Sequence, residues 1–198
     1  MRDKLLQLTD VLDFAFMSPL GFIDAWEKQE ISWVGYGRVF AILSAFSLAV
    51  GTSYISPPYT SGYIFPIILS TFANFAILIL LPTIFGSLID YFAQSKQRTG
   101  KAIMLRDFGN VSLSLFMLYA PICMILQAIG FTGLAGAFFA MITMFGFYLF
   151  VCSRGVKYIH DLKDSDAIRY SSYALGLSFF YPFLFNFYMT SFILNFTL

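Results

Sequence analysis

The side chains of this sequence that could perform acid–base or metal chemistry are few. His160 is the single histidine, so one chain cannot assemble an HExxH metal site or a His-paired catalytic triad. The acids Asp161, Asp164 and Asp166 follow at the spacing of a loose metal loop, but Lys163 interrupts them and no glutamate closes the run. We therefore expect neither an enzyme nor a bound metal or cofactor, and we interpret His160 as a solvated loop residue.

Three neutral amides, Asn74, Gln127 and Asn186, lie instead inside long apolar stretches. Polar side chains are costly in a bilayer and are the first place to look for function there. These amides either hydrogen-bond between helices and hold a bundle together, or they line a neutral polar path or ligand site. The same stretches hold no Asp, Glu, Lys, Arg or His, which counts against proton relays, voltage sensors and ion-coupled carriers.

The amides belong to a chain of membrane-type composition. Hydrophobic residues make up 59% and charged residues only 12%, against roughly 25% charged in a soluble domain. Residues 39–89, 108–153 and 170–198 contain no Asp, Glu, Lys or Arg. Because a helix needs about 20 apolar residues to cross a bilayer core, the first two blocks are each long enough for two crossings and the last for one.

The sequence thus predicts an all-α integral membrane helical bundle of about five transmembrane helices, preceded by an interfacial amphipathic helix. The transmembrane domain, residues 33–198, is expected to cross at about 34–54, 64–88, 108–129, 134–152 and 170–194. In a four-helix alternative, residues 171–198 lie in the membrane–water interface instead of crossing the bilayer. Prolines inside the crossings remove backbone donors and are candidate kinks; they are Pro82, Pro121 and Pro182.

Residues 1–32 are expected to form a cytoplasmic lead-in. Leu5, Leu8 and Leu12 recur at helical spacing, and Ser18-Pro19 offers a cap followed by proline in a first helical turn. The segment is too short and too charged to span, so we expect two short helices lying on the membrane surface.

The basic residues fall in three places: the amino-terminal region, the loop after the second crossing and the loop 153–169 after the fourth. The first of these loops, residues 92–107, carries Lys96, Arg98, Lys101 and Arg106. By the positive-inside rule the amino terminus is expected in the cytoplasm and the carboxyl terminus outside.

Three stretches resemble the Yip (Ypt/Rab-interacting protein) domain family of membrane proteins. Pro19 and Phe22 match the proline-x-x-phenylalanine lead-in of its bacterial members, Tyr119 and Pro121 match the aromatic-then-proline stretch of its third helix, and Gly155 lies in a segment like the loop before its last helix. The resemblance implies five crossings, a cytoplasmic amino terminus and, given the short lead-in, a bacterial-type member in the cytoplasmic membrane.

Two functions remain open. The first is a non-catalytic membrane scaffold or partner-binding subunit that acts through its cytoplasmic face, where the ionisable residues gather. The second is a small transport or lipid-handling subunit that uses the amides as a neutral polar path. We expect membrane lipid and a protein partner or second copy as interaction partners, and no nucleic acid.

Overall fold

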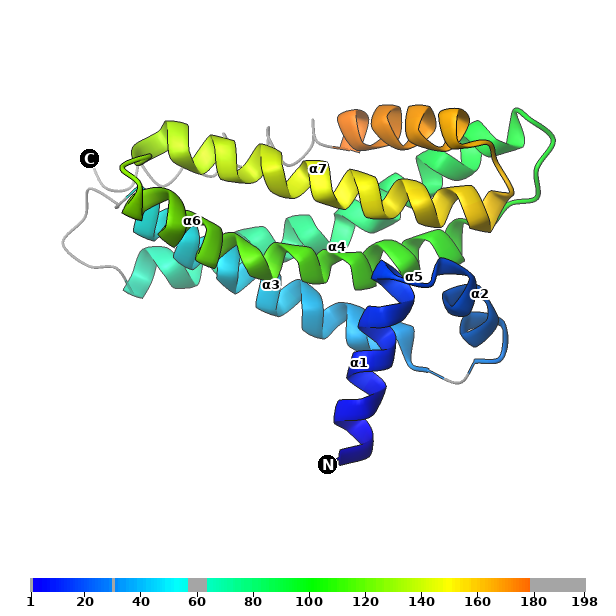
Figure 1. The fold of residues 1–198 in the computed structure, drawn as a ribbon, viewed down its shortest axis with the longest axis horizontal. Coiled ribbons are helices and arrows are strands. Elements are labelled where there is room, and N and C mark those ends of the chain that lie inside the picture. Colours follow the sequence, from blue (N-terminus) through cyan, green and yellow to red (C-terminus); the bar gives the residue numbers. More distant parts are fainter. Residues whose placement is uncertain (1, 30, 57–63, 179–198) are drawn as a thin grey trace.

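The computed structural model describes residues 2–29, 31–56 and 64–178, and these residues form helices and no strand. The helices run in the order α1 (Arg2–Phe16), α2 (Pro19–Glu27), α3 (Trp33–Ile55), α4 (Ile64–Gln94), α5 (Ala102–Ser112), the 3₁₀ helix η1 (Leu113–Leu118), α6 (Tyr119–Ala128) and α7 (Gly133–His160). A further helix covers residues 164–178 and is the orange ribbon of Figure 1. The predicted all-helical fold is confirmed.

Four helical rods in the described part of the chain are long and apolar enough to cross a membrane: α3, α4, the combined rod α5–η1–α6 and α7. They correspond to the first four predicted crossings. The fifth, expected at 170–194, is helical over its described residues up to 178. Its remainder, with Pro182 and Asn186, lies outside the described residues.

At the polar end of the bundle, the helices extend beyond the predicted ends of the crossings. α4 continues to Gln94 and α5 begins at Ala102, so the expected loop 92–107 shrinks to residues 95–101 and Arg106 lies inside a helix. Likewise α7 continues to His160, about two turns beyond the predicted end at residue 152. Helices can carry charged residues past the hydrocarbon core into water, so the first charge does not mark the end of a helix.

α3 is the central helix of the bundle. It packs against α4 on one side and against α5, η1 and α6 on another, while α7 packs on α5, η1 and α6. Figure 1 shows α2 beside the start of α5, and α1 projecting away from the long helices. The polar end, called here the charged end, comprises α2, residues 95–101 and residues 161–163. The opposite end, called here the uncharged end, contains the turn 129–132 between α6 and α7.

The predicted helix start at Ser18-Pro19 has the expected structure. Ser18 is the N-cap of α2, where its hydroxyl accepts a hydrogen bond from the Gly21 amide at 3.3 Å, and Pro19 begins the helix. In the tight turn 129–132, Gly130 has a φ of 83°, a left-handed conformation that glycine adopts without a Cβ clash. The two lead-in helices therefore exist as expected, and their position on a membrane surface stays a prediction.

The combined rod α5–η1–α6 is interrupted near its middle. Pro121 has no amide hydrogen and cannot donate to the carbonyl of Met117, four residues earlier, and the preceding residues adopt the 3₁₀ helix η1. Ser47 of α3 replaces the missing bond, because its hydroxyl donates to the Met117 carbonyl at 2.9 Å and accepts from the Ala120 amide at 3.0 Å. A neighbouring helix thus restores hydrogen bonds that the rod lacks, as irregular backbone in a bilayer requires.

α3 approaches this rod closely because its facing residues are small. A Cβ added at Gly51 would lie 2.7 Å from Cδ1 of Tyr119, and the buried Ser44 hydroxyl donates to the Leu113 carbonyl at 2.7 Å. Small and hydroxyl-bearing residues at helix interfaces are typical of membrane bundles. Pro82, the other candidate kink in the described chain, lies inside α4 and packs against Gly109 of α5.

Candidate functional site

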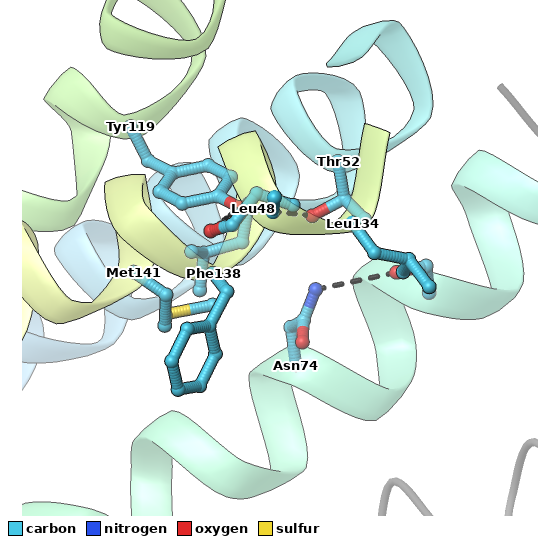
Figure 2. A pocket seen from close by; sticks show the side chains of 10 residues that line it. Leu48, Thr52, Asn74, Tyr119, Leu134, Phe138 and Met141 are labelled. Carbon is cyan, nitrogen blue, oxygen red and sulfur yellow. Dashed lines mark hydrogen bonds between the residues drawn. The ribbon is translucent and has the colours of Figure 1, made fainter. Parts of the chain in front are cut away.

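A cavity of about 700 Å³ lies toward the uncharged end of the bundle. Its walls come from α3, α4, α6 and α7, and Figure 2 shows the side chains that line it. The lining residues are Leu48, Thr52, Ser70, Asn74, Tyr119, Leu134, Ala135, Ala137, Phe138 and Met141. The lining is therefore apolar apart from hydroxyls and one amide, and none of these side chains is ionised at neutral pH.

The polar groups of the cavity are partly satisfied by one another. The Asn74 amide nitrogen donates to the Ser70 hydroxyl at 3.3 Å, a contact within one helix between residues i and i+4. Across the cavity Thr52 donates to the Tyr119 hydroxyl at 3.4 Å, and that hydroxyl donates to the carbonyl of Ala137 at 3.2 Å. The side-chain carbonyl of Asn74 has no hydrogen-bond donor among the described residues, so it is available to a ligand.

Of the two predicted amides in the described part of the chain, the structure brings Asn74 to this cavity. Gln127 lies near the end of α6 and is not among the lining residues. Asn186 is outside the described part of the chain. Sequence reasoning missed Thr52 as a lining residue, and it singled out Tyr119 only as part of a family-like motif. The i, i+4 pairs Leu48–Thr52 and Ser70–Asn74 were the available signal, since each pair shares one helix face.

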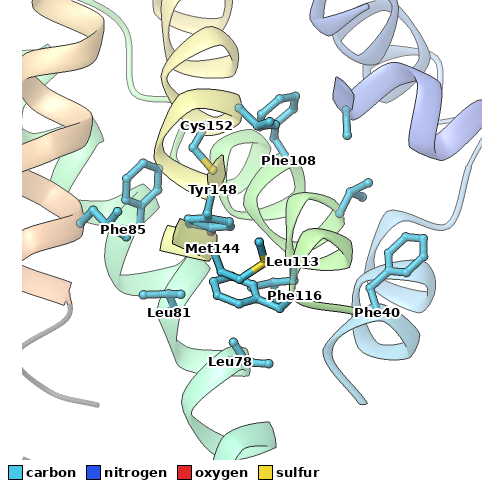
Figure 3. Close-up of a cluster of buried hydrophobic side chains, with 14 of the residues drawn as sticks. Phe40, Leu78, Leu81, Phe85, Phe108, Leu113, Phe116, Met144, Tyr148 and Cys152 are labelled. Carbon is cyan, nitrogen blue, oxygen red and sulfur yellow. The ribbon is translucent and has the colours of Figure 1, made fainter. Parts of the chain in front are cut away.

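An aromatic core separates the cavity from the charged end. Tyr148, Phe85 and Phe116 are each at most 1% exposed and are drawn with their neighbours in Figure 3. The ring centroid of Tyr148 lies 6.2 Å from that of Phe85 and 5.7 Å from that of Phe116. Both distances are within the range of favourable aromatic pairs. This packing joins α4, η1 and α7, so the two ends of the bundle share a rigid centre.

At the charged end, residues from two of the Yip-like stretches meet in one place. Pro19 and Phe22 of α2 are buried, and the Phe22 ring lies 5.0 Å from that of Phe108, edge to face. The Phe108 ring in turn occupies the space beside Gly155 where any other residue would place a Cβ. The lead-in is thus packed onto α5 and α7. Tyr119 and Pro121, which form the third stretch, lie elsewhere in α6, and Tyr119 lines the cavity.

Hydrogen bonds fix the lead-in to the same helices. The Trp26 indole donates to Asp107 at 3.1 Å, and the guanidinium of Arg106 pairs with the other oxygen of that carboxylate at 2.9 Å. Arg154 of α7 donates to the carbonyl of Phe16 at 2.9 Å, at the end of α1, where a cation also opposes the negative end of the helix dipole. The apolar face of α2 is therefore occupied by the bundle itself.

The interpretation of His160 as a solvated loop residue is wrong. Its side chain is 0% exposed, in the last turn of α7, and its Nε2 lies 3.9 Å from Oδ1 of Asp90. Asp90 in turn accepts from the Lys101 amide at 2.6 Å and from Gln94 at 2.8 Å. This carboxylate joins the end of α4 to the start of α5, so it has a clear structural role.

The predicted basic loop is divided among several environments. Lys96 is exposed, Arg98 pairs with Asp161 at 3.5 Å, Lys101 is the N-cap residue of α5 and Arg106 lies inside that helix. Two of these four cations, Arg98 and Arg106, are thus paired with the chain's own acids, and the four are not gathered in one patch.

No family model, curated protein or solved structure matches this chain. Function is therefore inferred from the residues of the cavity and of the charged end.

Proposed function

We propose that this multi-pass helical membrane protein binds a neutral lipid in the cavity between α3, α4, α6 and α7 and acts as a small lipid-handling subunit. The observation that carries the proposal is the cavity's lining, which combines apolar walls with a few convergent neutral polar groups. Such a pocket is the usual form of a small-molecule site.

The chemistry of the lining selects the ligand class. The Asn74 amide can accept from a ligand hydroxyl and donate its second N–H to an ester, and the Thr52 and Tyr119 oxygens can accept from a hydroxyl. Phe138 and Met141 offer an apolar wall to an acyl chain. A phosphate would enter without a cation to pair with it, which is costly away from water. A neutral glycerolipid of the diacylglycerol class fits both requirements.

Access from the bilayer is consistent with this class of ligand. Leu134 and Phe138 line the cavity and are 80% and 64% exposed, so the cavity reaches the outer surface of the bundle. In a membrane that surface faces acyl chains, and a lipid can enter laterally without crossing water.

The test is binding of a photoreactive diacylglycerol to the purified full chain in mild detergent. Replacing Asn74 with leucine removes one hydrogen-bonding group worth about 1 kcal/mol, so we expect about fivefold weaker labelling. Gln127→Leu is the matched control, because it makes the same change in α6 outside the cavity. Equal labelling of both variants and the unaltered protein would overturn the proposal.

The charged end supports a second candidate, a partner-binding membrane scaffold of the Yip type. Pro19, Phe22 and Gly155 pack into a single unit there, so the lead-in would present a fixed surface to a partner. This candidate requires the charged end to face the cytoplasm of a bacterial-type cell. We therefore also propose that the charged end faces the cytoplasm.

A further inference from the structure

A second, smaller cavity of about 210 Å³ lies between α3, α4 and α5, nearer the charged end. Its polar lining contains two arginines, Arg38 of α3 and Arg106 of α5, together with Asn110 and Thr83. Ala41 and Ile79 belong to its apolar lining. Three helices thus direct two cations and two neutral polar side chains to one place.

Arg38 is a cation without a protein partner among the described residues. It is exposed, and no hydrogen bond or ion pair joins it to another described residue. Arginine inside an apolar helix is costly in a bilayer unless it finds an anion or water. Its five donors match the oxygens of a phosphate group.

Arg106 contributes to the same cavity although it is already in an ion pair. Its Nε and Nη2 atoms donate to one oxygen of Asp107, which leaves the Nη1 donors of the guanidinium free. Asp107 is 5% exposed, and its other oxygen accepts from Trp26. The carboxylate is therefore engaged behind Arg106, and the cavity keeps a net positive charge.

The depth of the site matches a lipid headgroup. Arg38 lies in the second turn of α3, which starts at Trp33, so it is about 7 Å from the helix start at ~1.5 Å per residue. Beyond the cavity α3 exposes apolar residues to the outside, among them Ile42 and Phe46 at 50% and 54% exposure. A ligand in this cavity would place its polar group beside the arginines, and its apolar part would lie against the apolar surface of α3.

From this arrangement we propose that the cavity binds the phosphate of an anionic phospholipid of the phosphatidylglycerol class. The site goes beyond the proposed function, because it uses other residues and the opposite charge preference from the neutral cavity. A free phosphate offers the same oxygens, but it leaves the apolar surface beside Ile79 and Val34 without a partner.

The test offers equal amounts of phosphatidylglycerol and phosphatidylcholine to the full chain in mixed micelles and measures the retained lipid by native mass spectrometry. The unaltered protein should retain phosphatidylglycerol preferentially. Arg38→Gln should lower that retention about tenfold, the effect of losing a charge-assisted contact. Because Arg38 is exposed and unpaired among the described residues, the variant should keep its helix content and melting temperature.

Arg169→Gln is the matched control. It removes the same charge from an exposed position in the helix 164–178, and retention should not change. Millimolar inorganic phosphate should fail to displace the lipid, and Asn74→Leu should leave this binding intact. Equal loss in both arginine variants, equal retention of the two lipids, or displacement by inorganic phosphate would overturn the proposal.

Discussion

Two glycines of α7 show how differently the same residue type is constrained in this protein. At Gly155 an added Cβ would overlap the ring of Phe108, which itself packs on Phe22 of the lead-in. At Gly146, on the same helix, no described side chain or neighbouring helix lies within 4 Å of the position a Cβ would take. One glycine is needed for close packing, and the other only weakens the helix.

Gly155→Ala is therefore expected to destabilise the protein by about 1–3 kcal/mol, the usual cost of overpacking a filled core. Thermal unfolding of the purified protein in detergent, followed by circular dichroism, measures the change. Gly146→Ala is the matched control and should be neutral or stabilise by up to about 1 kcal/mol, because alanine favours the helix. A Gly155→Ala protein as stable as the control would contradict the packing described at Phe108.

At the scale of the element, the rod α5–η1–α6 depends on its neighbour for its shape. Pro121 breaks the regular hydrogen-bond pattern, and Ser47 of α3 supplies both an acceptor for the Ala120 amide and a donor for the Met117 carbonyl. The 3₁₀ turn sits beside Tyr119, the first residue of α6 and a lining residue of the larger cavity. The interruption thus helps to place a functional side chain.

Ser47→Ala should destabilise the bundle by about 1–3 kcal/mol, since it leaves two buried backbone groups without a partner. The free energy of unfolding in mixed micelles tests this value. Ser87→Ala is the control, because the Ser87 hydroxyl is exposed and bonds only within its own helix, to the Thr83 carbonyl. If the two variants lose the same small amount, the bridge from α3 does not support η1.

The sequence predicted four described crossings and the lead-in helices because a bilayer tolerates few ionisable groups in its core. It did not predict how far the helices extend at the polar end, since α7 continues through charged residues such as Arg154 and Lys157. The cavity could not be predicted from the sequence for another reason. Thr52 and Tyr119 are far apart in sequence, and their meeting depends on how α3 and the interrupted rod pack.

At the scale of the whole molecule, the described ionisable residues gather toward one end. Ion pairs and hydrogen bonds at that end link α4 to α5 through Asp90 and residues 95–101 to residues 161–163 through Arg98. The turn 129–132 at the other end carries no charge. By the positive-inside rule, such an asymmetry predicts one preferred orientation in a membrane.

Lys96→Cys and Thr132→Cys test that orientation, since both positions are exposed at opposite ends of the bundle and the native Cys123 and Cys152 are buried. In intact cells a membrane-impermeant maleimide should label Thr132→Cys. Lys96→Cys should react only after the cells are permeabilised. Labelling of both from one side would contradict the multi-pass arrangement, and the reverse pattern would contradict a cytoplasmic scaffold surface.

The length of α4 has a consequence for the kind of bilayer that suits this protein. The charge-free part of this 31-residue helix, residues 64–89, extends about 39 Å at ~1.5 Å per residue, longer than a hydrocarbon layer of about 30 Å. Hydrophobic mismatch of this sign is relieved by tilting the helix or by thickening the lipid around it. Thin bilayers should therefore strain α4 more than thick ones, which gives membrane thickness a means of influencing where the protein accumulates.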